Sequence, residues 1–287
     1  MSLFAIAGLQ LEISGKDNRY LIQKEIEKTI RQFPWVQMVV IGELATFGID
    51  KSFAQELPGE IENFYCRIAK DLGIWLIPGS IYEKDGDNIY NTALVIEPQG
   101  KVVGRYRKMY PFHPYEGNVA GGSDFLVFDV PEVGRFGLNI CYDQWFPETI
   151  RQMAWMGAEV MICPTMTNTT DRELELCLAR ANAISNQCYV FNVNVAGALG
   201  NGKSIVIDPE GKILHQAGDI HEKFPLELDL ALVRRVRERG VHGLGQTLKS
   251  FRDANIEFPV YRGSKPEGTV AKLGPLEKPG RNKSNLD

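Results

Sequence analysis

Residues 95–103 read VIEPQGKVV, and residues 206–214 repeat the pattern as VIDPEGKIL, at an offset of 111 (206 − 95). Both copies place an acid-Pro-x-Gly turn between two short apolar runs, which is typical of a β-hairpin. Each copy also follows a helix pattern and a strand pattern at similar distances. Hairpin turns often use proline and glycine, but the matching residue types along the whole stretch favour an internal repeat.

Strand and helix patterns alternate on both sides of these hairpins. The strand patterns cover residues 4–11, 36–41, 74–77, 160–163 and 189–195, and the helix patterns cover 18–32, 58–71, 147–156 and 171–186. Such alternation is typical of an α/β protein with buried sheets. The repeat predicts two sheet-and-helix halves that pack against each other as one domain.

Composition excludes several classes of protein. The 287 residues are 44% hydrophobic and 24% charged, as in an ordinary globular protein, and the formal net charge is −4. The chain therefore lacks the basic surface that a nucleic-acid partner requires. No apolar run is long enough to span a bilayer, and a strand pattern begins at once without a signal-peptide layout. These features predict a protein without a membrane segment.

The cysteines indicate the compartment. Five cysteines are scattered along the chain, and none forms a Cys-x-x-Cys pair. This pattern suits free thiols in a reducing cytoplasm, not a disulfide framework or a zinc site. We therefore expect a cytoplasmic protein.

The chain divides into residues 1–262 and 263–287. The first segment carries all the strand and helix patterns, whereas the second is rich in glycine, proline and charge. We expect a single folded domain followed by a tail. The tail is either disordered or an arm laid across a neighbouring subunit.

Cys141 follows a strand pattern and precedes Pro147, which suits a first helical turn. A thiol at the carboxyl end of a strand lies near backbone N–H groups that favour a thiolate and an oxyanion. A buried structural cysteine is the alternative, and it is the more common one. The position alone makes Cys141 a candidate nucleophile.

Two charged residues also follow apolar strand patterns. Glu43 comes after the run 36–41, where burial would raise the pKa of a carboxylate and suit it to act as a base. Lys108 comes after the first hairpin and could place a fixed positive charge beside an oxyanion. A helix cap or ion pair for Glu43, and a solvated surface position for Lys108, are the alternatives.

Motifs for other chemistries are missing from the sequence. There is no His-Glu-x-x-His pair, no phosphate-binding loop and no Gly-x-Gly-x-x-Gly after a strand. The four histidines do not lie in a papain-like context. We therefore expect no metal and no cofactor.

The set Glu43, Lys108 and Cys141 resembles the nitrilase superfamily of carbon–nitrogen hydrolases, which is known for a Glu-Lys-Cys triad. The resemblance covers about residues 3–260 and rests on GEL at 42–44, YRK at 106–108 and CYD at 141–143. It implies an αββα sandwich with an internal pseudo-two-fold axis, in agreement with the repeat. It also implies a homodimer or a higher homo-oligomer.

Glu116 adds a fourth match. It lies in a Pro-x-Glu-Gly segment after Lys108, similar to the aliphatic amidase and formamidase branch of the superfamily. The resemblance implies that Glu116 positions the substrate and supports the lysine. Four aromatic residues could line a small pocket or could equally be core: Phe47, Phe112, Tyr142 and Trp145.

The resemblance implies hydrolysis of a small amide through a cysteinyl thioester, with release of ammonia and an acid. Gln144 and Trp145 stand where relatives that hydrolyse N-carbamoyl amino acids place arginine, which favours a neutral substrate. Nitrile or N-carbamoyl hydrolysis and acyl transfer use the same nucleophile and stay open. A non-catalytic binding protein and a redox thiol protein are alternatives of another class.

Overall fold

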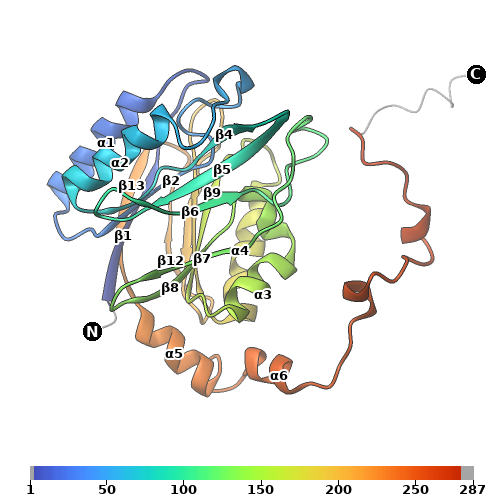
Figure 1. Ribbon diagram of the computed structural model, residues 1–287. Helices are drawn as coiled ribbons and strands as arrows, with labels where there is room; N and C mark the ends of the chain where they lie inside the picture. Colours follow the sequence, from blue (N-terminus) through green and yellow to red (C-terminus); the bar gives the residue numbers. More distant parts are fainter. Residues whose placement is uncertain (1–2, 279–287) are drawn as a thin grey trace, which may run out of the picture.

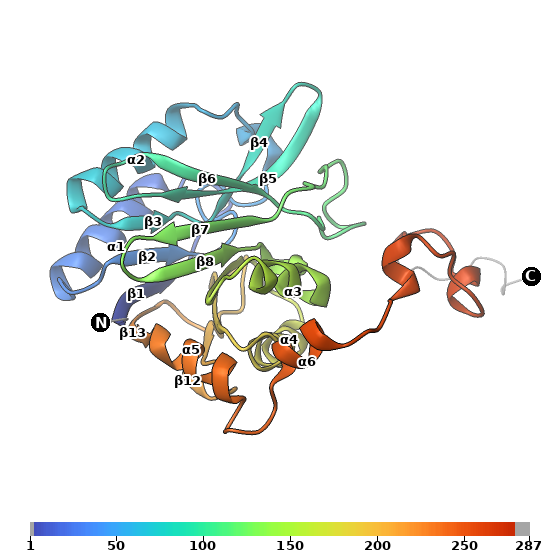
Figure 2. The same ribbon diagram turned by 60° about the horizontal axis from the view of Figure 1, so that its bottom comes forward.

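Two β-sheets pack face to face between two layers of helices in the computed structural model, which describes residues 3–278 (Figures 1 and 2). The first sheet has the order β13-β1-β2-β3-β5-β4, with β6 paired to β5. Its strands are β1 (Leu3–Gln10), β2 (Met38–Ile41), β3 (Trp75–Ile77), β4 (Ser80–Asp85), β5 (Asn88–Ile96), β6 (Val102–Arg107) and β13 (Glu222–Asp229).

The second sheet has the order β12-β11-β10-β9-β8-β7. Its strands are β7 (Leu126–Val130), β8 (Gly134–Leu138), β9 (Val160–Thr165), β10 (Tyr189–Asn194), β11 (Ile205–Ile207) and β12 (Ile213–Gln216). The helices are α1 (Arg19–Gln32), α2 (Glu60–Leu72), α3 (Pro147–Trp155), α4 (Arg172–Asn186), α5 (Leu230–Arg239) and α6 (Thr247–Asp253), with 3₁₀ turns η1 (Lys51–Phe53), η2 (Cys141–Trp145), η3 (Pro259–Arg262) and η4 (Val270–Lys272).

Alternating residues of the central strands build the layers. Met38 and Val40 of β2 face the second sheet, whereas Val39 and Ile41 pack with the residues of α1 and α2. In the second sheet, Met161 of β9 packs with α3 and α4. This period of two places one apolar core between the sheets and one under each helix layer. The predicted αββα sandwich is confirmed.

The two halves repeat the same path. β1, β2 and β3 run parallel and lead into the antiparallel hairpin β5–β6, just as β8, β9 and β10 lead into β11–β12. In both turns the acid's N–H bonds to the lysine carbonyl, at 2.9 Å for Glu97 and 3.0 Å for Asp208. The glycines have φ of 78° and 86°, a left-handed conformation that favours glycine. The internal repeat is therefore present in structure as well as in sequence.

Most predicted boundaries agree with the structure within two residues. The helix expected to open on Pro58 instead begins at Glu60, with Gly59 as its N-cap. Gly59 has an extended backbone, and a side chain there would meet the carbonyl oxygen of Glu56 at 2.5 Å. The proline therefore precedes the helix rather than forming its first turn.

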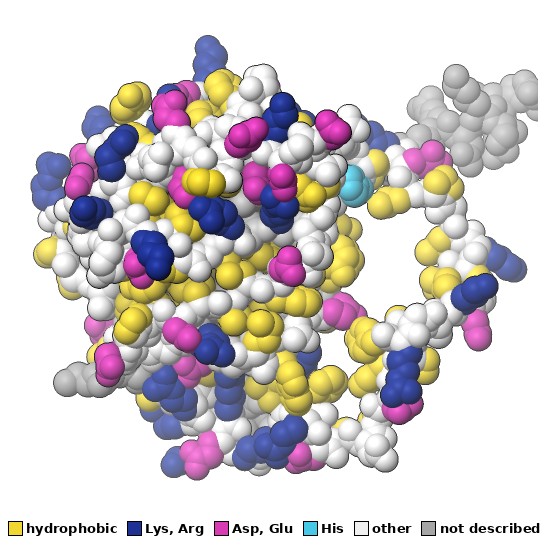
Figure 3. Space-filling view, viewed as in Figure 1, with side chains coloured by type: hydrophobic (Ala, Val, Ile, Leu, Met, Phe, Trp, Pro, Cys, Tyr) yellow, Lys and Arg dark blue, Asp and Glu magenta, His cyan; other side chains and the backbone are white. Residues whose placement is uncertain are grey.

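The chain after α5 leaves the sandwich. From residue 254, directly after α6, it runs as an arm along the outside of the molecule (Figure 1). Figure 3 shows hydrophobic side chains along this arm. Ile256, Val260, Leu273 and Leu276 are each exposed. Residues 279–287 of the predicted tail lie outside the described residues. Within residues 3–278, no helix has the length and apolar character needed to cross a membrane.

Candidate active site

Cys141 lies at a sharp turn between β8 and α3. It is the first residue of η2 and has φ of 46°, a conformation that residues with a side chain rarely adopt. The buried Asp143 carboxylate accepts hydrogen bonds from the N–H groups of Ile140 (2.9 Å) and Tyr110 (2.8 Å) and from the Tyr106 hydroxyl (2.7 Å). These three bonds hold the turn that presents the thiol. The Cys141 side chain is buried, with 7% of the residue exposed.

Glu43 follows β2 by two residues and is bound to the second sheet. Its N–H donates to the carbonyl of Thr165 at 3.1 Å, and its Oε2 accepts from the N–H of Met166 at 3.0 Å. The preceding Gly42 permits this approach, because a Cβ at Gly42 would lie 2.6 Å from Val195 and 3.0 Å from the Thr165 carbonyl oxygen. The carboxylate is thus fixed at the junction of the two sheets.

Lys108 follows β6 and lies between two carboxylates. Its Nζ is 2.8 Å from Glu43 Oε1 and 2.6 Å from Glu116 Oε2. Only 2% of the Lys108 side chain is exposed. The Glu116 carboxylate also accepts from the N–H of Phe112 at 2.6 Å, and Asn91 donates to both Glu43 (2.8 Å) and Glu116 (3.3 Å). The lysine therefore has a single position, set by groups from β5, from the loop after β2 and from the loop after β6.

Burial and charge shift the pKa values of this group. Burial, with the nearby Glu43 and Glu175 carboxylates, holds the pKa of the Cys141 thiol well above its ordinary value. Burial also raises the pKa of Glu43, and the Glu116 charge adds to that rise. The pKa of Glu116 is lowered because Lys108, the N–H of Phe112 and the Asn91 side chain outweigh its burial. The thiol is therefore protonated at rest, beside a carboxylate that can accept its proton.

These residues line one cavity of about 600 Å³. Glu43, Lys108, Glu116 and Cys141 all contribute to its wall, and so do the predicted binding residues Phe112 and Tyr142. Phe112 packs between Tyr115 and Tyr142, with ring centroids 4.9 Å from each. The structure therefore brings six of the eight predicted site residues together.

Phe47 and Trp145 are not part of the cavity lining. The chain turns back after Glu43, where Leu44 has φ of 48°, and Phe47 then packs in the core beneath α1 and α2. Its ring stacks on Phe53 with centroids 4.9 Å apart. Trp145 ends η2 and packs on Tyr142 with a centroid distance of 5.8 Å. Trp145 thus supports a residue of the cavity wall, whereas Phe47 belongs to the core.

The sequence reasoning missed the wall between β9 and α4. Thr167, Asp171 and Glu175 line the cavity there, and the Thr167 hydroxyl lies 3.7 Å from Cys141 Sγ. Asn91 and Asp143 were also missed. The only signal for this wall is its position, because a short polar loop after β9 must lie at the same sheet edge as Cys141.

Within residues 3–278, no group of three His, Cys, Asp or Glu side chains has an arrangement that could hold a metal ion. The buried charges of the site are instead paired with one another. Lys108 is the positive group among the carboxylates at Cys141, in the place where an oxyanion would need a counter-charge.

Known proteins match both the sequence and the fold. The sequence profile of the carbon–nitrogen hydrolase family matches residues 5–238. The omega-amidase NIT3 of Saccharomyces cerevisiae is 31% identical over 262 residues, covering 81% of this chain and 89% of that protein. A formamidase of Bacillus cereus is 32% identical over 215 residues, covering 69% and 64%. The crystal structure of a carbon–nitrogen hydrolase from Helicobacter pylori superimposes with a TM-score of 0.77 at 26% identity, covering 91% and 98%.

Proposed function

The chain belongs to the carbon–nitrogen hydrolase family and is an amidase-type enzyme, and on this premise we propose that it hydrolyses small primary amides with Cys141 as the nucleophile. The products are ammonia and a carboxylic acid. Glu43, Lys108 and Glu116 are the other groups of the proposed mechanism.

In the first step the Cys141 sulfur attacks the amide carbon while Glu43 accepts the thiol proton. The raised pKa of the thiol makes this transfer necessary, and the raised pKa of Glu43 suits it to the task. The carbonyl oxygen becomes an oxyanion. An ammonium has three N–H donors, and Lys108 uses two of them on Glu43 and Glu116. The third donor, with the backbone N–H of Tyr142, is assigned to the oxyanion.

In the second step the C–N bond breaks and a thioester remains on Cys141. Glu43 returns its proton to the leaving nitrogen, which departs as ammonia. The same carboxylate then takes a proton from a water molecule that attacks the thioester carbon, and the acid is released from the restored thiol. Glu116 holds Lys108 in place throughout and acts as a positioning residue.

The observation that carries this proposal is the position of Lys108. A fully buried lysine between two carboxylates, beside a buried thiol and inside a cavity, has no comparable role in stabilising the fold. Such an arrangement supports a reaction in which negative charge develops next to sulfur. In this arrangement Glu43 is the acid–base group, and Lys108 is the group that binds the oxyanion.

The acyl group is proposed to be short and without a carboxylate. Lys51 and Lys108 are the cationic residues of the described cavity lining, and Lys108 already binds two carboxylates. Gln144 is buried and Trp145 packs on Tyr142, so neither supplies a cation for an anionic substrate. The volume of the cavity fits a small molecule.

We also propose a cytoplasmic homo-oligomer, with residues 254–278 laid across a neighbouring subunit. Apolar side chains on this arm are strongly exposed in the single chain, for example Leu273 at 74% and Leu276 at 75%. Exposed apolar groups of this size are typical of an interface. The free cysteines support a reducing compartment.

A panel of short amides, nitriles and carbamoyl compounds tests the function, with ammonia release as the readout. Mass spectrometry of Cys141 during turnover would detect the acyl group as a covalent adduct. We expect ammonia from short primary amides and an adduct on Cys141 alone among the five cysteines. No ammonia and no adduct across the panel would contradict the proposal and favour a binding protein.

A further inference from the structure

A second carboxylate contacts the sulfur from the side of α4. Glu175 Oε1 lies 3.9 Å from Cys141 Sγ and accepts a hydrogen bond from the Thr167 hydroxyl at 3.0 Å. Only 3% of Glu175 is exposed, yet it lines the cavity. Its partners differ from those of Glu43, so it belongs to a separate hydrogen-bond network. The mechanism proposed above makes no use of it.

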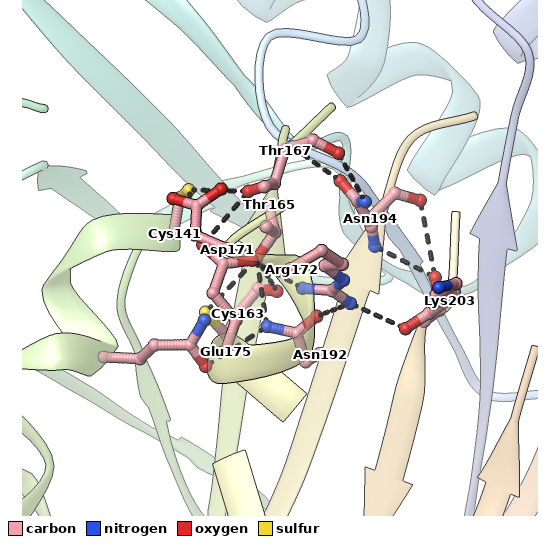
Figure 4. Close-up of polar contacts among 12 residues, drawn as sticks. Cys141, Cys163, Thr165, Thr167, Asp171, Arg172, Glu175, Asn192, Asn194 and Lys203 are labelled. Carbon is pink, nitrogen blue, oxygen red and sulfur yellow. Dashed lines mark hydrogen bonds and ion pairs between the residues drawn. The ribbon is translucent and has the colours of Figure 1, made fainter. Parts of the chain in front are cut away.

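Arg172 fixes both the charge and the direction of this carboxylate. Its Nη1 is 2.9 Å from Glu175 Oε2, and its Nη2 donates to Asn192 Oδ1 at 2.7 Å and to the Lys203 carbonyl at 2.8 Å. Figure 4 shows the Arg172 guanidinium between Glu175 on one side and Asn192 and Lys203 on the other. The buried guanidinium thus binds the Glu175 carboxylate through one of its two oxygens, Oε2. With Oε2 bound to Arg172, Oε1 is the oxygen that faces the cavity.

This oxygen gains a free acceptor position during the reaction. At rest Oε1 faces the thiol, and the thiol loses its proton when the sulfur attacks. An acyl group bonded to Sγ then has its first carbons within a few ångströms of Oε1. A methyl group there would leave Oε1 with the Thr167 hydroxyl as its donor and would fill the second acceptor position of a buried carboxylate oxygen with an apolar group, which costs stability. An ammonium group there would donate to it.

We propose that Glu175 determines specificity by binding an amino group on the acyl part of the substrate, so that the preferred substrates are amides of small amino acids. The inference rests on the proposed amidase function, and it replaces the neutral substrate expected from Gln144 and Trp145 with one that carries an ammonium group. The amino group lies one or two carbons from the carbonyl, and a carboxylate in its place is repelled by Oε1.

Matched substrates test this assignment. Glycinamide and propionamide have the same shape and differ by an ammonium in place of a methyl group at about pH 7, and malonamate places a carboxylate there. We expect the wild-type kcat/KM for glycinamide to exceed that for propionamide by about tenfold or more, as for a charge-assisted hydrogen bond. Glu175→Gln should bring the ratio close to one, and malonamate should be the poorest substrate of the three.

Glu173→Gln is the control, because Glu173 lies on the same helix, pairs with the exposed Lys203 and does not line the cavity. It should retain the wild-type ratio. Should Glu175→Gln fail to fold, Glu175→Asp keeps an anion near Arg172 but withdraws it from the sulfur, and the ratio should still fall. An equal loss on both amides, or a wild-type preference for propionamide, would overturn the proposal.

Binding to a Cys141→Ala variant separates the two hypotheses. Calorimetry should show tighter binding of glycinamide than of propionamide, and Glu175→Gln in this background should abolish the difference. This readout does not need turnover. If the wild-type enzyme released no ammonia while the binding preference held, the proposed function would fail and the role of Glu175 would stand.

Discussion

Glu43 accepts from Lys108 through Oε1 and from the N–H of Met166 through Oε2, and in the proposed mechanism it also accepts the thiol proton. A glutamine has one acceptor oxygen, so it can keep the bond to Lys108 but loses the bond from Met166. It cannot accept the Cys141 proton. Glu43→Gln should therefore remain folded and lose at least about 100-fold in kcat, measured as ammonia release beside a thermal melt.

Glu62→Gln is the matched control for that variant. Glu62 is also buried and paired with a cation, Arg105, but it lies on α2 outside the cavity. Its loss should cost stability and leave turnover close to wild type. A Glu43→Gln enzyme with near-normal kcat would exclude Glu43 as the base.

The pH profile reports on the same carboxylate. As the pH falls through the pKa of Glu43, the base becomes protonated and kcat/KM falls. Because burial raises this pKa, the acid limb should have its midpoint above pH about 4.3, the value for an exposed glutamate. The negative charge of Glu116 adds to the rise, so Glu116→Gln should move the midpoint to lower pH.

In Glu116→Gln the shift of the acid-limb midpoint can be measured separately from the loss of kcat. Glu116→Gln should also reduce kcat, because Glu116 helps to hold Lys108. The midpoint does not depend on the maximal rate, so the two effects can be measured in one profile. A midpoint that stays in place or moves to higher pH would show that Glu43 does not control the acid limb.

At the scale of elements, the end of β2 depends on one close approach. A methyl group on Gly42 would meet both Val195 and the Thr165 carbonyl that binds the Glu43 N–H. Gly42→Ala should therefore lower the free energy of unfolding by about 1–3 kcal/mol and reduce kcat by displacing Glu43. Urea denaturation and ammonia release measure the two effects.

Gly15→Ala is the control for this substitution, because a Cβ at Gly15 meets nothing within 4 Å. It should change the free energy of unfolding by less than about 0.5 kcal/mol. If Gly42→Ala behaved like Gly15→Ala in both measurements, the close approach would have no influence on the site.

The site residues that follow the strands could be predicted from the sequence, whereas the residues of the cavity wall between β9 and α4 could not. Glu43, Lys108 and Cys141 each follow an apolar run, so local pattern and the family resemblance were enough to select them. Glu175 contacts Cys141 only because α4 packs beside η2, and no local pattern encodes that packing. Phe47 was misplaced for a similar reason, since the turn after Glu43 directs it into the helix-side core.

At the scale of the whole molecule, the arm should control assembly. Among the residues that the structure describes, those that line the cavity all precede residue 254. A chain that ends at Asp253 should therefore keep its folded sandwich, whereas the number of chains per particle in solution, the particle mass divided by the mass of one chain, should be lower than for the full-length protein. Light scattering after size-exclusion chromatography measures this change.

Leu273→Asp together with Leu276→Asp provides a version of this test without truncation. Both leucines are exposed on the arm, so the substitutions should not disturb a single chain but should weaken a contact with a neighbour. An unchanged number of chains per particle for both the truncated and the substituted protein would exclude the arm from the interface.

The two matching halves determine how many reactive groups each chain can carry. β-sheet register aligns Val40 with Ile162 through their partners Ile77 and Phe191, and it aligns Gly8 with Leu138. In the same alignment Leu11 corresponds to Cys141, and Thr165 corresponds to Glu43. The offset of 111 between the two hairpins makes Asp219 the equivalent of Lys108. The second, symmetry-related position thus holds an aliphatic side chain, a hydroxyl and a carboxylate. The stoichiometry of acylation should therefore be one acyl group per chain, although the architecture is duplicated.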